Sequence, residues 1–220
     1  MKGLVLEGGG VKGSYQVGSY YAFRDCHIKI DGFVGTSIGS FNALMLASHK
    51  ELELLDFWYN VNPGLLLGFD EDFVELFNGG DLSFDSIKGA FDTLKAIVKN
   101  VGLDNSGMYK AMYKIVDFNA LMNSKCDFGL VTVKMPKMKP IYVTKEMLKD
   151  KKHLCEYVMA SCNLPIFRNK KLVDDHYYID GGFYDNSPTK LLVDKKYKTL
   201  YVINIKGIVL IERYEMIELK

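Results

Sequence analysis

The 220-residue sequence lacks the features that mark several common protein classes. Its four cysteines form no C-x-x-C pair and have no histidine at zinc-ligand spacing, so we expect reduced thiols and no metal site. No apolar run is long enough for a signal peptide or a membrane span. We therefore expect a cytoplasmic protein without a transmembrane segment, and leave peripheral membrane contact open.

The sequence also lacks an excess of positive or negative charge. The formal net charge is +1, and no Lys/Arg cluster is interleaved with aromatic residues, so we expect no nucleic-acid partner. Apolar residues make up 48% of the chain and charged residues 25%, which is typical of a globular protein. The length suits one domain over residues 1–220. The sequence leaves the oligomeric state open.

What the chain does contain is a repeated unit of strand, glycine turn and helix. Residues 3–6 predict a buried strand and residues 11–24 a helix. Residues 28–34 predict a second strand, which the turn at residues 35–39 separates from an apolar helix at residues 40–49. Two such units imply parallel strands with right-handed crossovers. We therefore expect an α/β sheet with its site at the carboxyl ends of the strands.

The rest of the chain is less uniform. Residues 58–126 form a variable region in which the spacing of apolar side chains predicts an amphipathic helix at 84–98. Five further elements follow from strand and helix periodicity: a hairpin of strands 128–135 and 141–144, a helix at 153–161, and strands at 177–179 and 199–205.

The second glycine turn carries a motif of catalytic importance. Gly35-Thr36-Ser37-Ile38-Gly39 matches G-x-S-x-G and lies between a predicted strand and a predicted helix, the context in which this motif exposes a nucleophile. An ordinary Gly/Ser-rich turn is the alternative. We favour Ser37 as a nucleophile next to a helix N-terminus.

None of the four histidines is well placed to activate Ser37. His49 is about 18 Å away along the predicted helix, and His27 lies at the opposite end of the preceding strand. His176 lies about 13 Å before Asp180 on its strand, and nothing around His153 suggests a catalytic setting. We expect all four to be surface or half-buried side chains.

Asp180 is the alternative base. It ends a short apolar strand, and Gly181-Gly182 behind it allow another backbone to approach closely. If the sheet is parallel, its strand ends share one edge, so Asp180 can reach Ser37. Partial burial would raise the pKa of the carboxyl and make it a better base. A plain Asp-Gly-Gly turn is the other interpretation.

The first glycine turn admits two functions. Gly8, Gly10 and Gly13 match G-x-G-x-x-G, which binds a dinucleotide, but the same amides could stabilise the oxyanion of an ester under attack. A dinucleotide site needs a free acidic residue at the end of the second strand, where residues 35–37 stand instead. No Gly-Lys-Ser/Thr follows, which excludes a P-loop. We favour the oxyanion function and expect no cofactor.

Together, these motifs resemble those of the patatin-like phospholipase family. The resemblance rests on five segments in the family's order: Gly8-Gly9-Gly10-Val11-Lys12-Gly13, Gly35-Thr36-Ser37-Ile38-Gly39, residues 160–167, Asp180-Gly181-Gly182 and Tyr184-Asp185-Asn186-Ser187-Pro188. It implies a three-layer α/β sandwich with a mostly parallel central sheet, related to the α/β-hydrolase type. Residues 58–126 would be a variable region inserted in that single domain, with the 84–98 helix as a lid or as a cover of the sheet.

The resemblance also implies a mechanism. Ser37 and Asp180 would form a dyad without histidine, and the amides of Gly9 and Gly10, within the 8–13 loop, would stabilise the oxyanion. The family commonly has arginine where Lys12 stands, so the positive charge is kept but the bidentate geometry is not.

The implied activity is hydrolysis of lipid acyl esters, of the phospholipase A, lysophospholipase or esterase type. The partners would be a lipid or phospholipid and, transiently, a membrane surface. A thioesterase or transacylase is a variant of the same chemistry. The rival functions are a slow lipid-binding or regulatory protein on the same fold and a nicotinamide-dependent oxidoreductase.

Overall fold

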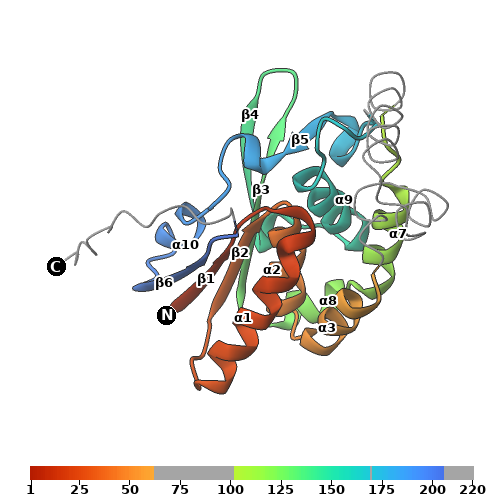
Figure 1. Cartoon of the computed structure of the whole chain (residues 1–220). Helices are drawn as coiled ribbons and strands as arrows, with labels where there is room; N and C mark the ends of the chain where they lie inside the picture. The colour runs from red at the N-terminus through yellow and green to blue at the C-terminus, as the bar shows by residue number, and fades with distance from the viewer. Residues whose placement is uncertain (62–101, 169, 206–220) are drawn as a thin grey trace, which may run out of the picture.

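The computed structural model describes residues 1–61, 102–168 and 170–205 (Figure 1). The helix expected at residues 84–98, and with it the lid hypothesis, lies outside these ranges. The described part of the 58–126 region contains two helices that the sequence analysis did not predict, α7 (Ser106–Ile115) and α8 (Phe118–Asn123).

A six-stranded sheet forms the centre of the structure. Its main path runs in the order β4-β3-β2-β1-β6. Four strands are mutually parallel: β1 (Lys2–Leu6), β2 (Gly32–Thr36), β3 (Asp127–Lys134) and β6 (Thr199–Ile203). Strand β4 (Lys139–Thr144) pairs antiparallel with β3, as the predicted hairpin requires. The mostly parallel α/β sheet is thus confirmed, although β2 begins four residues later than expected.

The strand that carries Asp180 has a direction that the sequence analysis did not anticipate. Strand β5 (Tyr178–Asp180) pairs antiparallel with β3, not parallel. Strand β2 pairs with β3 only as far as Val131, and β3 continues to Lys134. Its remaining edge groups need a partner, and β5 supplies it. Thr36 therefore pairs with Val131 while Asp180 pairs with the next residue, Thr132.

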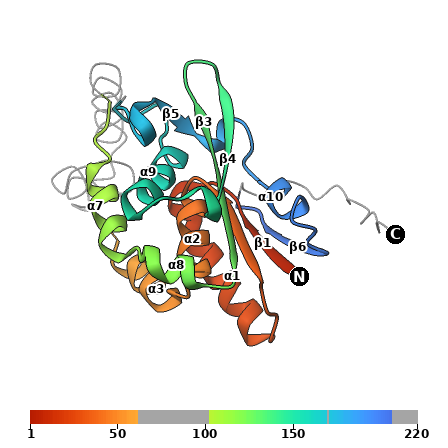
Figure 2. The same cartoon turned by 180° about the vertical axis from the view of Figure 1, so that it is seen from behind.

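Helices cover the two faces of the sheet unequally. In Figure 1, one face carries most of them, including α1 (Gly13–Asp25), α2 (Ile38–Ala47), α3 (Glu51–Asn60) and α9 (Lys151–Ser161). The short helix α10 (Lys190–Val193) lies on the opposite face, as the reverse view in Figure 2 also shows. Of the described helices, none combines the length and apolar character needed to cross a membrane.

The core follows from the alternation of side chains along the strands. Leu4 and Leu6 of β1 are buried in the large cluster under the main helix layer, whereas Val5 belongs to a small cluster with Leu191 and Leu192 around α10. Every residue of α2 is buried. This explains why its sequence is apolar all round rather than amphipathic.

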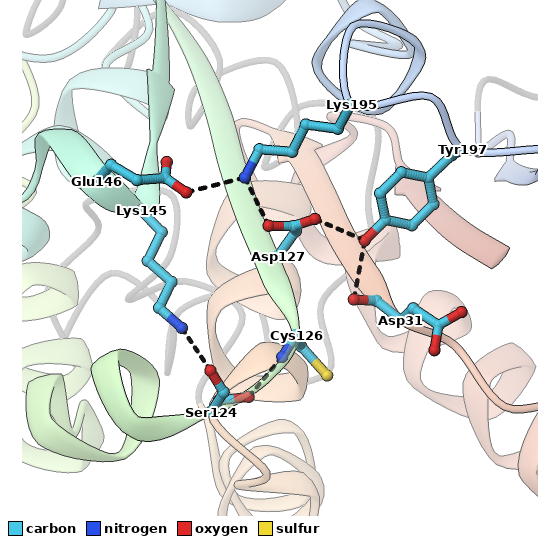
Figure 3. A network of polar contacts seen from close by, with 8 residues as sticks. All are labelled: Asp31, Ser124, Cys126, Asp127, Lys145, Glu146, Lys195 and Tyr197. Carbon is cyan, nitrogen blue, oxygen red and sulfur yellow. Dashed lines mark hydrogen bonds and ion pairs between the residues drawn. The ribbon is translucent and has the colours of Figure 1, made fainter. Parts of the chain in front are cut away.

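A polar network fastens the edge of the sheet where the parallel strands begin (Figure 3). The hydroxyl oxygen of Tyr197 lies 2.9 Å from the Asp31 carbonyl oxygen and 2.8 Å from Oδ2 of Asp127, and these two acceptors share its single proton. The ammonium of Lys195 lies between the carboxylates of Asp127 and Glu146. Tyr197 thus ties together the starts of β2 and β3, and the segment before β6.

Candidate active site

Ser37 occupies a strained turn between β2 and α2. Its φ of 54° lies in the left-handed region, which a non-glycine residue adopts at a cost of about 1–3 kcal/mol. The Ser37 amide donates to Oγ of Ser161 at 2.9 Å, and the Ser161 hydroxyl donates to the Val131 carbonyl at 2.6 Å. The strained residue is therefore held in place by α9 and β3.

The glycines two residues on either side of Ser37 are sterically required. A Cβ on Gly35 would collide with the carbonyl oxygen of Gly39, and a Cβ on Gly39 would collide with the carbonyl oxygen of Leu6. Both obstacles are backbone atoms in the packed interior and cannot turn aside as a side chain can. These collisions explain the G-x-S-x-G spacing.

Asp180 is buried next to this turn, with 3% of its surface exposed. Its Oδ1 accepts the Gly182 amide at 2.7 Å, and its Oδ2 is buried without a hydrogen-bond partner among the described residues. Burial raises the pKa of the carboxyl to about 6, and the neighbouring Ser37 hydroxyl and the Gly182 amide partly offset this effect. The hydroxyl thus lies beside the carboxyl without satisfying Oδ2. At neutral pH, a carboxylate with this pKa is largely free to accept a proton.

Two hydrogen bonds with Asn163 hold the strand that ends at Asp180. The Asp180 amide donates to the Asn163 carbonyl at 2.9 Å, and the side chain of Asn163 donates to the Tyr178 carbonyl at 2.7 Å. Behind it, a Cβ on Gly181 would collide with the carbonyl oxygen of Val131. The glycine after the aspartate therefore lets β5 end directly against β3, in line with β2.

The first glycine turn lies against the serine. A Cβ on Gly8 would stand 2.9 Å from Cβ of Ser37, so any larger residue would crowd the predicted nucleophile. Gly10 has a φ of 59°, which explains the need for glycine there. In the described part of the chain, the amides of Gly9 and Gly10 donate no hydrogen bond. They are therefore available to a ligand.

A chain of buried side-chain amides braces this loop. The amide of Gln16 donates to the Glu7 carbonyl at 2.7 Å. The amide of Asn42 donates to the Gly13 carbonyl at 2.9 Å and to Oε1 of Gln16 at 2.8 Å, and the Trp58 indole donates to Oδ1 of Asn42 at 2.9 Å. Both ends of the glycine turn are thereby fixed to α2 and α3. Sequence reasoning missed these residues because no local pattern marks them.

Asn186 links the two loops of the site. Its Nδ2 donates to the Gly8 carbonyl at 3.3 Å, and its Oδ1 would lie 2.9 Å from a Cβ on Gly182. The preceding residue, Asp185, accepts the Thr36 hydroxyl through its carbonyl and the Tyr142 hydroxyl through its carboxylate, each at 2.9 Å. The segment after Asp180 is thus anchored to the end of β2. The only sequence signal for Asn186 was its place in the 184–188 segment.

A buried thiol lies next to Asp180. Cys162 is buried next to Ser37, Ser40 and Asp180, and this burial raises the pKa of its thiol. The thiol is therefore a neutral neighbour rather than a competing nucleophile. Of the other cysteines, Cys126 and Cys155 are buried and Cys26 is exposed, and all are free thiols.

All four histidines lie within the described residues, and none belongs to the site. His27, His49 and His176 are exposed, as expected. The expectation of a surface or half-buried side chain is wrong for His153, which is buried because it packs edge-on against Tyr157. It precedes Ser161 by eight residues on α9, about 12 Å along the helix.

Lys12, the other charged residue singled out by sequence, is exposed at the rim. Its ammonium forms no ion pair or hydrogen bond within residues 1–61, 102–168 and 170–205. Across the same residues, no three His, Cys, Asp or Glu side chains gather as a metal site would require.

Comparisons with known proteins agree with the motifs. The family described as patatin-like phospholipase matches residues 4–193. Among solved structures, the chain is similar to VipD from Legionella pneumophila, with 16% identity and a TM-score of 0.45 over 85% of this chain. The chain spans about half of that protein, 47% of its length, and a likeness at this level says nothing about function. No curated protein matches the sequence.

Proposed function

The chain belongs to the patatin-like phospholipase family, and we propose that it is a serine lipid acyl hydrolase with Ser37 as nucleophile and Asp180 as base. The observation that carries the proposal is the register on β3. Thr36, which precedes the serine, pairs with Val131, and Asp180 pairs with Thr132. Strands β2 and β5 thus approach from opposite directions and end next to each other, at Thr36 and Asp180.

The chemistry follows from this arrangement. Asp180 accepts the proton of the Ser37 hydroxyl as Oγ attacks the ester carbonyl, and the free amides of Gly9 and Gly10 stabilise the negative oxygen. The alcohol leaves with a proton from Asp180, and an acyl-enzyme remains. Asp180 then activates water, which releases the fatty acid and restores the serine. The buried, unpaired Oδ2 of Asp180 supports its role as proton acceptor.

Contact with a lipid surface is part of the proposal. Three large apolar side chains are exposed on the loops that carry the site: Val11 (40%), Phe183 (54%) and Tyr184 (60%). Val11 directly follows the 8–10 glycines, and the two aromatic residues directly follow Gly182. Such side chains favour the interface between water and lipid. The ester of a membrane lipid could therefore reach Ser37 without leaving the bilayer entirely.

The test uses p-nitrophenyl esters of increasing chain length and phosphatidylcholine vesicles. We expect Ser37→Ala and Asp180→Asn each to lose at least a thousandfold in kcat. Ser19→Ala, at a half-buried serine on α1, is the control and should leave the activity unchanged. Glutamine at His153 or His176 should leave the rate within a fewfold of the parent enzyme. A fluorophosphonate should label the parent but not Ser37→Ala; an active Asp180→Asn enzyme would rule out the dyad.

The same assay separates the alternatives. A slow lipid-binding protein on this fold would bind vesicles and yet show no burst or turnover above that of Ser37→Ala. An oxidoreductase would bind a nicotinamide cofactor at the 8–13 loop. That loop lies against Ser37, which favours the oxyanion function over the dinucleotide one.

A further inference from the structure

A second concave site lies at the opposite end of α2 from Ser37. Helix α2 runs for ten residues from Ile38, so its last turn is about 15 Å from the serine. There the ends of α1, α2 and α8 and the starts of β2 and β3 enclose an open cavity of about 770 Å³. This volume is in the range of small-molecule sites.

Basic side chains line the cavity, and among the described residues no carboxylate does. They are Arg24, Lys29 and Lys125, together with the imidazoles of His27 and His49. The chain as a whole has 28 Lys and Arg against 27 Asp and Glu, so a lining with basic groups and no carboxylate departs from its average composition. Charges of one sign that line a concave surface together attract a ligand of the opposite charge more strongly than each does alone.

Nearby carboxylates offset only part of this charge. Asp25 pairs with Arg24 at 3.3 Å, and Glu51 lies 4.0 Å from His49. Lys29 and Lys125, in contrast, have no ion-pair partner within the described ranges. The ammonium groups of Lys29 and Lys125 are therefore available to a ligand.

Helix capping does not account for these two lysines. Three helices end at the cavity, and basic side chains often stabilise such ends. The capping contact that exists is made by another residue: the ammonium of Lys145 donates to the Ser124 carbonyl at 2.6 Å, just after α8 (Figure 3). Among the described residues, neither Lys29 nor Lys125 makes such a bond.

We propose that this cavity binds an organic phosphate, with the phosphate held by Lys29 and Lys125. A phosphate carries close to two negative charges at neutral pH and so suits several cations better than a carboxylate does. The cavity is much larger than one phosphate, and its floor includes Ile28, Ile30 and the ring of Tyr20. An apolar or aromatic portion of the ligand packs against these side chains.

The test measures binding and is independent of hydrolysis. Glycerol 3-phosphate and inorganic phosphate are titrated at constant ionic strength while backbone amide resonances are followed by NMR. We expect saturable shifts at residues 27–30 and 123–126. The Kd of Lys29→Gln/Lys125→Gln should be at least tenfold weaker, about 1.4 kcal/mol. Lys137→Gln/Lys139→Gln removes two exposed lysines from the β3–β4 hairpin and should change the Kd by less than twofold.

Vesicles with and without phosphatidate form the second arm, read by flotation with the same two variants. Binding of the soluble phosphates identifies a free phosphate as the ligand source, and Lys29/Lys125-dependent binding of phosphatidate vesicles alone identifies a lipid headgroup. The proposal is overturned if none of the probes binds saturably, or if both double variants weaken binding equally. Circular dichroism and thermal unfolding of the variants verify that they are folded.

Discussion

Replacing Asp180 by Asn should make the folded protein more stable while removing the proposed base. The carboxyl is buried, and its pKa is raised from the ordinary 3.8 to about 6, mainly by that burial. Above pH 6, the folded protein therefore carries an ionised group in a place that disfavours charge. Asparagine has the same shape, keeps an oxygen for the Gly182 amide and carries no charge.

The expected gain follows from the two pKa values. The difference between 3.8 in the unfolded chain and about 6 in the folded protein corresponds to about 3 kcal/mol at 25 °C. The folded state binds the extra proton, so the contribution of Asp180 to the stability of the parent protein is most favourable below pH 4. It falls as the pH rises from about 4 to 6, and is lower by the full amount above that range. Allowing for the new amide group, we expect Asp180→Asn to exceed the parent by about 1–3 kcal/mol at pH 7.

Urea unfolding followed by tryptophan fluorescence or circular dichroism, at intervals from pH 4 to pH 8, measures this difference. The gain should be near zero at pH 4, about half complete at pH 5 and constant above pH 7. Asp194→Asn, an exposed aspartate on the same chain, should change stability by less than about 0.5 kcal/mol at every pH. A gain that does not vary with pH, or a loss of stability at pH 7, would refute the assigned cause.

Three further outcomes can be checked separately. For the hydrolysis of a neutral ester, kcat/KM should rise with pH with a midpoint near pH 6, because ionised Asp180 is the proposed base; a flat profile between pH 5 and 7 would contradict this. Gly39→Ala should destabilise the protein by more than about 2 kcal/mol in denaturant unfolding, because the added Cβ would collide with a backbone carbonyl oxygen. The control, Gly18→Ala, lies at an open position on α1 and should be neutral or stabilising by up to about 1 kcal/mol. Tyr197→Phe should lower Tm and cost about 1–3 kcal/mol because it removes the hydroxyl that two acceptors share at the sheet edge, and Tyr59→Phe, at an exposed position on α3, should leave Tm unchanged.

The parts of the structure that the sequence predicts correctly are those governed by short-range sterics. The turn around Ser37 needs glycine two residues away on each side, and this requirement is visible in five consecutive letters of sequence. The β3–β4 hairpin and the first two strand-turn-helix units likewise follow from local periodicity. The proximity of Asp180 to Ser37 was predicted from strand ends, but the assumed direction of its strand was wrong.

The parts that were missed depend on residues far apart in the chain. Nothing local marks Asn42 as a brace of the glycine turn, since its bonds to Gly13 and Gln16 span 29 and 26 positions. The basic cavity joins residues near position 25 to residues near position 125. Such groupings arise only when helices pack on the sheet.

The sequence alone therefore determined the α/β class and the sharp serine turn, because backbone geometry and strand or helix periodicity constrain neighbouring residues directly. The tertiary structure decided that β5 runs antiparallel in line with β2, that burial raises the pKa of Asp180 to about 6, and that Lys29 and Lys125 share a cavity at the far end of α2. Strand direction, burial and electrostatic environment are properties of the packed chain, since each depends on atoms that only folding brings together.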